Sequence, residues 1–173
     1  MRFPTADNKK IDQPQASRML LYAIDNGVNY IDTAWPYHGT KSEPFIGRTL
    51  QKNGYRNKVR IATKLPSWAI EKRSDLDNYL ERQLKRLRID RIDYYLLHAL
   101  NRTRWDFLSS LEVLEWLERK RDEGKIRYIG FSFHDEYDVF SAILNAYEWD
   151  LCQIQYNYMN LTYQAGRRGL REA

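Results

Sequence analysis

Short apolar runs alternate with longer stretches of helical periodicity along this chain. The runs have the length and the β-branched and aromatic content of strands. They cover residues 29–34, 59–64, 92–98, 126–132 and 151–157. Their starts recur at about the thirty-residue interval of β-α-β units, and parallel strands need helical crossovers between them. The pattern therefore predicts an all-parallel sheet with helices on its outside.

The stretches between the runs predict helices with identifiable ends. The first helix begins near Asp12, a residue type that caps helix N-termini, and ends at Asn26-Gly27. Residues 106–124 predict one long helix that stops at a glycine. Residues 163–173 predict one more helix at the end of the sequence.

Five polar side chains close or follow the predicted strands. They are Asp32, Lys64, His98, Ser132 and Gln153. In a parallel α/β barrel, the residues at the carboxyl ends of successive strands converge on one site. Taken singly, each of the first three has a purely structural interpretation. Asp32 would cap the following turn, Lys64 would reach solvent, and His98 would be a core histidine. Burying all three without mutual pairing would cost several kcal/mol, so the set favours one shared site.

Length limits this interpretation. The 173 residues fit about one domain, and 43% hydrophobic residues are ample material for its core. We therefore expect residues 1–173 to form a single domain. A complete eight-stranded barrel typically needs roughly 250 residues. The sequence predicts a barrel with strands missing.

Charge and cysteine content restrict the other function classes. The net charge of +5 comes from basic residues mixed with acidic ones in helical stretches, which disfavours nucleic-acid binding. No apolar run approaches the ~18 residues of a membrane span, and the polar start is not a signal peptide, so we expect a cytoplasmic protein. The single Cys152 excludes a cysteine cluster for metal, and His38 and His134 lack metal-ligand spacing, so no metal is expected.

Five segments, in order and at their spacings, carry a family resemblance. They are DTAWPYHGTKSE from Asp32, IATK ending at Lys64, DYYLLH ending at His98, EGKIRYIGFS ending at Ser132, and QIQYN from Gln153. Together they resemble the aldo-keto reductases, NAD(P)H-dependent carbonyl reductases built on a (β/α)8 barrel. The resemblance covers essentially the whole chain. It implies reduction of a small-molecule aldehyde or ketone, with NADPH or NADH as the cofactor.

The resemblance also implies a role for each residue. Carbonyl reduction needs a hydride donor and a proton donor, and Tyr37 corresponds to the family's proton-donating tyrosine. A free tyrosine ionises near pH 10, so a cation must favour its ionised form, and Lys64 corresponds to the lysine that does so. Asp32 would pair with Lys64, and His98 would donate an imidazole N–H to the carbonyl oxygen.

Two further residues correspond to cofactor ligands. Ser132 and Gln153 match polar residues that hydrogen-bond the nicotinamide carboxamide in relatives and so fix which ring face presents its hydride. Where many relatives have Ser-Asn after the fifth strand, this chain has Ser132-Phe133, so one such contact is lost or replaced. Three tryptophans on loops after strands, Trp35, Trp68 and Trp105, are as suited to a substrate pocket as to packing.

The chain also departs from the family pattern in length. The first strand is expected to be reduced to MRFP, so that about strands 1 to 6 are present and strands 7 and 8 are missing. The segments GFSFHD and QIQYNYMN resemble those of one branch of the family. Longer members of that branch add a ferredoxin-like, cysteine-rich tail, which this sequence does not contain. In relatives, the segments after the last strands bind the cofactor's pyrophosphate and adenosine phosphate.

Several accounts of the shortened barrel stay open. The chain is a fragment of a longer enzyme, a natural truncation that dimerises to close its sheet, or an inactive relative that keeps the site. Open sheet edges would also favour self-association. A second functional class is a nucleotide-sensing protein that binds other proteins without catalysis. The residues Asp32, Tyr37, Lys64 and His98 favour an enzyme, because a binding protein has no need of a proton donor.

Overall fold

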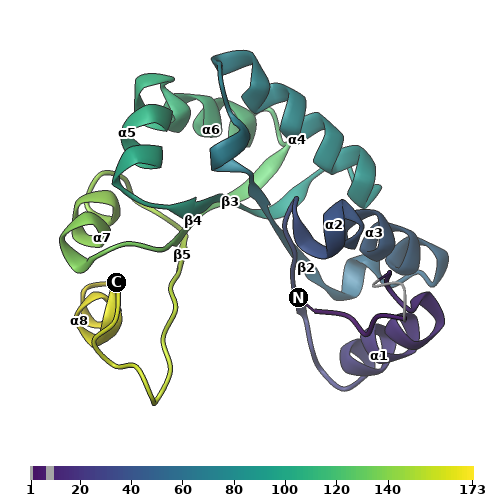
Figure 1. Ribbon diagram of the computed structural model, residues 1–173. Helices are drawn as coiled ribbons and strands as arrows, with labels where there is room; N and C mark the ends of the chain where they lie inside the picture. The colour runs from purple at the N-terminus through teal and green to yellow at the C-terminus, as the bar shows by residue number, and fades with distance from the viewer. Residues whose placement is uncertain (1, 7–9) are drawn as a thin grey trace.

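Five parallel strands form the sheet in this computed structural model, which describes residues 2–6 and 10–173. The strands pair in chain order and are all parallel. They are β1 (Tyr30–Asp32), β2 (Arg60–Leu65), β3 (Ile92–Leu100), β4 (Ile126–Phe133) and β5 (Leu151–Gln153). Figure 1 shows the strands following an arc with helices along its outer side. The predicted parallel sheet with outer helices is therefore confirmed.

The helices that cover the sheet occupy the stretches between strands. They are α1 (Gln13–Asp25), α2 (Tyr37–Thr40), α3 (Ser42–Lys52), α4 (Arg73–Leu87), α5 (Arg102–Ser110), α6 (Val113–Asp122), α7 (Tyr137–Leu144) and α8 (Gly166–Glu172). Two short 3-10 turns, η1 (Arg56–Lys58) and η2 (Ser67–Ala69), flank β2. The predicted cap of α1 is confirmed, because the Asp12 carboxylate accepts the Gln15 N–H at 3.1 Å. No helix within the described ranges is both long and apolar enough to cross a membrane.

The long helix predicted over residues 106–124 is wrong, because the chain breaks between α5 and α6. Glu112 adopts a left-handed conformation (φ 55°) at the break. Helix α5 buries Leu108, and α6 buries Val113. Five residues along one continuous helix would separate these side chains by about 140° around its axis. The break lets both face the sheet, and Arg73 donates a hydrogen bond to the carbonyl of Leu111 that the break leaves free.

The expected reduced first strand does not form either. Met1 lies outside the described residues, and Arg2–Pro4 belong to no strand. The Phe3 N–H donates to Nε2 of His38 at 2.9 Å, and Pro4 has no N–H, so this segment cannot supply a hydrogen-bonded ladder. Phe3 instead packs edge-on against Phe45 of α3, with ring centroids 4.8 Å apart. The five strands correspond to the expected second to sixth.

The main core lies between the outer face of the sheet and the helices. Helix α4 contributes Leu76, Leu80, Leu84 and Leu87, all buried, and spaced so that they share one helix face. Burying each such side chain contributes about 1.5–3 kcal/mol to the free energy of unfolding. The helical crossovers are thus held on the outer side, and the carboxyl ends of the strands are left at one edge of the sheet.

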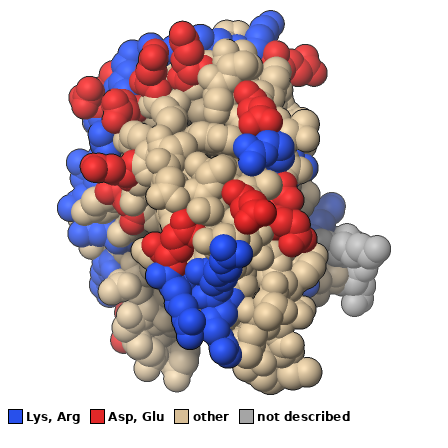
Figure 2. Space-filling view, turned by 90° about the vertical axis from the view of Figure 1, so that its left-hand side faces the viewer, with Lys and Arg blue, Asp and Glu red and all other residues tan. Residues whose placement is uncertain are grey.

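Charged side chains of both signs occupy the outer surface. Figure 2 shows acidic and basic side chains interspersed over much of the face that carries α5 and α7, with a group of basic side chains in its lower part. Several ion pairs join residues three or four positions apart along α6 and its C-cap residue Glu123. Examples are Arg121 with Glu118 at 3.3 Å and Lys120 with Glu123 at 2.9 Å. Exposed pairs of this kind contribute little to the free energy of unfolding.

Gly47 tests how closely α3 approaches α4. A Cβ atom at this position would lie 2.5 Å from the Leu87 carbonyl oxygen and 2.7 Å from that of Arg86. Glycine-to-alanine changes inside helices ordinarily raise the free energy of unfolding. Here we expect Gly47→Ala to lower it by about 1–3 kcal/mol, as overpacking does, measured by urea denaturation. The control is Lys52→Ala at the exposed end of α3, and a stabilising effect of Gly47→Ala would contradict the packing described.

Candidate active site

A buried lysine joins the ends of β1 and β2. Nζ of Lys64 lies 2.6 Å from Oδ1 of Asp32 and donates to the carbonyl oxygen of Thr33 at 3.0 Å and to the hydroxyl oxygen of Tyr37 at 3.3 Å. The Lys64 side chain is 1% exposed, and that of Asp32 is 23% exposed. An ammonium group at such depth needs these partners, since burial of an unpaired charge is costly. The structure therefore brings three of the sequence-predicted residues into direct contact.

His98 faces the same group from the end region of β3. Its ring centroid lies 6.0 Å from that of Tyr37, at a steep angle of 76°. Burial, followed by the positive charge of Lys64, lowers the pKa of His98 to about 3. The imidazole is therefore neutral at physiological pH, with one N–H to donate. Its buried Nδ1 has no hydrogen-bond partner among the described residues.

Ser132 lies at an irregularity between β3 and β4. Its Oγ accepts the N–H of Ala99 at 2.7 Å, where Ala99 adopts a left-handed φ of 52° and the strand register shifts between Leu97 and Leu100. Ser132 thus satisfies a backbone donor that the shifted ladder would leave unpaired. Since its oxygen accepts that bond, the hydroxyl hydrogen can still be donated elsewhere.

Gln153 reaches the site from the end of β5. Its Nε2 lies 3.4 Å from Oδ1 of Asp32, although the two residues are 121 positions apart in the sequence. The sheet has brought together the first and last of its strand ends. All six sequence-predicted residues therefore lie at the carboxyl edge of the sheet or directly after it.

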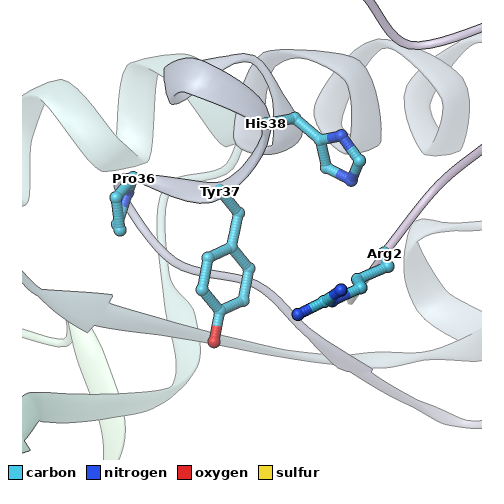
Figure 3. Close-up of a pocket in the computed structure, with 4 residues that line it drawn as sticks. All are labelled: Arg2, Pro36, Tyr37 and His38. Carbon is cyan, nitrogen blue, oxygen red and sulfur yellow. The ribbon is translucent and has the colours of Figure 1, made fainter. Parts of the chain in front are cut away.

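An open pocket of about 510 Å³ adjoins the tyrosine. It is lined by Arg2, Pro36, Tyr37 and His38. Figure 3 shows the Tyr37 hydroxyl and the Arg2 guanidinium directed toward the same space. Arg2 is not among the residues predicted for the site, because the sequence of residues 1–4 predicts a reduced strand. Pro4 disfavours that strand, because proline has no N–H to donate to a strand ladder.

The aromatic surroundings distinguish the three loop tryptophans. Trp68 in η2 is 47% exposed, and its ring centroid lies 5.0 Å from that of His98. Trp105 is 8% exposed and belongs to the core. Trp35 packs between the guanidinium of Arg86 and the ring of Tyr79. Of the three, Trp68 is thus the tryptophan that borders His98.

Metal ligands do not gather at this edge. Across residues 2–6 and 10–173, no three His, Cys, Asp or Glu side chains are placed to hold a metal ion. His134 contacts Oε1 of Gln164 at 3.2 Å, and the His38 ring accepts the Phe3 N–H. The chemistry of the site is that of a cation, a carboxylate, a phenol and a neutral imidazole.

The Asp32–Lys64 pair can be tested through stability. Asp32→Asn keeps the shape of the side chain but leaves the buried ammonium of Lys64 without its anionic partner. We expect the free energy of unfolding to fall by about 2–4 kcal/mol, less than for a fully buried pair because Asp32 is partly exposed. In a double-mutant cycle by urea denaturation, Asp32→Asn should cost much less when Lys64 is methionine. Equal costs in both backgrounds would show that the two side chains are not coupled.

His98 gives a pH-dependent prediction. Its folded pKa of about 3 lies below the unfolded value of about 6.5, so only the unfolded chain binds a proton in that window. The contribution of His98 to stability is therefore complete above pH ~6.5 and is lost as pH falls, at about 1.4 kcal/mol per pH unit. Chemical denaturation between pH 4 and 7 should show this loss in the wild type relative to His98→Gln. A constant difference between the two proteins across that range would contradict the burial effect.

Comparisons with known proteins identify the family to which this sequence is similar. The sequence model of the Aldo/keto reductase family matches residues 1–171. The aldo-keto reductase YhdN of Bacillus subtilis is 32% identical over 143 residues, which cover 76% of this chain and 41% of YhdN.

Two solved structures share the fold. The aldo-keto reductase AKR11C1 from Bacillus halodurans, in its holo form, superposes with a TM-score of 0.71 at 28% identity and covers 84% of this chain and 49% of its own. An aldo-keto reductase from Klebsiella pneumoniae in complex with NADPH gives a TM-score of 0.68 at 27% identity, with 84% and 47% covered. The chain spans less than half the length of each of these three relatives.

These matches confirm the expected architecture. The five-stranded parallel sheet is a half-barrel of the (β/α)8 type seen in those structures. The family match extends over nearly the whole sequence. This protein therefore belongs to the aldo/keto reductase family.

Proposed function

We propose that this chain carries the carbonyl-reducing site of an NAD(P)H-dependent aldo-keto reductase, with Tyr37 as the proton donor. The observation that carries the proposal is the position of Lys64, whose Nζ contacts both Asp32 Oδ1 at 2.6 Å and the Tyr37 hydroxyl at 3.3 Å. A pure binding protein has no need for a buried cation on a phenol. The substrate class is a small aldehyde or ketone.

The four residues divide the work of proton transfer. Tyr37 donates its hydroxyl proton to the carbonyl oxygen as negative charge develops there. The Lys64 ammonium stabilises the negative charge that then remains on the phenol oxygen, and Asp32 keeps that ammonium charged and oriented. The neutral His98 donates an N–H to the same carbonyl oxygen, which orients the substrate. The contacts of Lys64 with Asp32 and Tyr37 support the first three roles, and the neutral state of the imidazole supports that of His98.

The residues present fit the nicotinamide end of the cofactor. NADPH, when bound, supplies the hydride to the carbonyl carbon. The side-chain amide of Gln153 and the hydroxyl of Ser132 would hold the carboxamide of its ring, because both lie at the same edge as Lys64. The partner-free Nδ1 of His98 marks a further polar position that a bound molecule or water would satisfy. This fit concerns the nicotinamide end alone.

The runner-up function is nucleotide binding without turnover. Ser132 and Gln153 would serve such binding without any proton transfer, because both would orient a nicotinamide and neither would react. We also propose self-association through the edge strands β1 and β5, which have one strand neighbour each in the described sheet. The two functions differ in whether cofactor oxidation depends on Tyr37.

Tyr37→Phe tests the mechanism. We expect NADPH to bind to the 173-residue chain, seen as a change in its fluorescence, and the variant to bind equally well. Carbonyl reduction should fall by about 10²–10⁴-fold in the variant, because the proton donor is lost and the ring remains. Tyr22→Phe, which removes an exposed hydroxyl from α1, is the matched control. Oxidation that continues unchanged in Tyr37→Phe would refute the assigned role, and binding without any oxidation would favour the nucleotide-binding alternative.

A further inference from the structure

The loop that carries Tyr37 has an unfavourable backbone. His38, Gly39 and Thr40 have consecutive positive φ angles of 53°, 56° and 69°. This left-handed region suits glycine, whereas His38 and Thr40 carry side chains that disfavour it. Such a conformation persists only where the surrounding structure holds it.

Arg86 holds this loop from both sides of Tyr37. Its guanidinium lies over the ring of Trp35, with Cζ 4.0 Å from the ring centroid. The same group donates a hydrogen bond to the carbonyl oxygen of Thr40. Trp35 precedes Tyr37 by two residues, and Thr40 follows it by three. One side chain from α4 therefore contacts the loop before and after the phenol.

Glu43 fixes the position of Arg86. Its carboxylate is fully buried, and Oε2 lies 3.2 Å from Nη1 of Arg86, an ion pair without a well-aligned hydrogen bond. Oε1 accepts from Thr63 Oγ1 and from Gln83 Nε2, both at 2.6 Å. The carboxylate is thus held by hydrogen bonds from one helix, α4, and one strand, β2.

The same network reaches the backbone of the lysine. Nε2 of Gln83 lies 3.1 Å from the carbonyl oxygen of Lys64, and Oε1 of Gln83 accepts the Tyr95 hydroxyl at 2.8 Å. Thr63 and Lys64 are consecutive in β2 and point to opposite faces of the sheet. The hydrogen bond from Gln83, on the helix side of β2, therefore holds the backbone of Lys64, whose side chain lies on the opposite face of the sheet.

We infer that Arg86, oriented by the buried Glu43, is a positioning residue that sets where the Tyr37 hydroxyl lies relative to Lys64. It contacts neither the phenol oxygen nor Lys64 Nζ, and it acts through the backbone of the loop. The inference rests on the proposed function for its catalytic consequence, although its structural consequence can be measured without turnover.

The contrasting interpretation is that Arg86 only stabilises the fold. Three variants separate the two. Arg86→Met removes the charge and the donors, whereas Arg86→Lys keeps a charge opposite Glu43 but lacks the planar fork needed to stack and donate together. Leu76→Ala leaves a cavity beneath the other end of α4, ten residues from Arg86, and so lowers stability without removing a hydrogen bond of Glu43 or Arg86.

The test uses the full chain labelled with 13C at the tyrosine ζ carbon. The Tyr37 signal is assigned by its loss in Tyr37→Phe, and thermal midpoints are measured in parallel. We expect this signal to move in Arg86→Met and in Arg86→Lys, and to stay at the wild-type position in Leu76→Ala even where the thermal midpoint falls. An unmoved signal in folded Arg86→Lys overturns the inference, as does an equal movement in Leu76→Ala. If Arg86→Met does not fold, Arg86→Lys decides.

Kinetics with NADPH and a neutral aromatic aldehyde give the second measurement. Misplacing the proton donor should lower kcat in both Arg86 variants by about 10- to 100-fold, with the KM for NADPH within about twofold of wild type. A parallel loss of kcat in Leu76→Ala would favour the purely structural interpretation and overturn ours. If the wild-type chain itself has no turnover, the proposed function fails, and the position of the tyrosine signal still decides the inference.

Discussion

The buried ammonium of Lys64 is the constraint on which the arrangement of this protein's active edge depends. A charge that is 1% exposed must be paired, and its three partners come from the β1 end, the residue after it and the loop beyond. Meeting this requirement aligns two strand ends and places a phenol beside a cation. Burial lowers the pKa of His98 and the same charge adds to this effect, so that the imidazole stays neutral. Stability and the proposed chemistry therefore depend on the same few contacts.

Strand β2 connects two polar layers of different character. In front of it, Lys64 faces Asp32 and Tyr37, where a substrate can approach. Behind it, Thr63 contacts Glu43 in a closed network that solvent does not reach. This network favours one arrangement, because any other would leave buried charges or donors unpaired, and the remaining Glu43 oxygen is held by its ion pair with Arg86. The rear layer can thus fix geometry that the front layer uses.

The half-barrel carries the proposed reacting groups at its strand ends, in a sheet that has two edges. Family membership follows from a match over residues 1–171, and the strand ends supply the proposed reacting groups. The sheet that holds them has two edges, at β1 and β5, where a complete barrel has none. The relatives named above are more than twice as long as the matched portion.

The sequence by itself determined the strands, their parallel order and the six polar residues of the candidate site, because apolar periodicity and the position of a residue at a strand end are local properties. It did not predict the break at Glu112, because that depends on which side chains α5 and α6 must both bury. The predicted strand at residues 1–4 was wrong, and the position of Arg2 beside Tyr37 depends instead on the packing of Phe3 against α3. Only the tertiary structure decided that Arg86 lies against the Tyr37 loop, since that contact joins residues 46 positions apart. Contacts between distant segments depend on the packing of whole helices, and no local pattern encodes them.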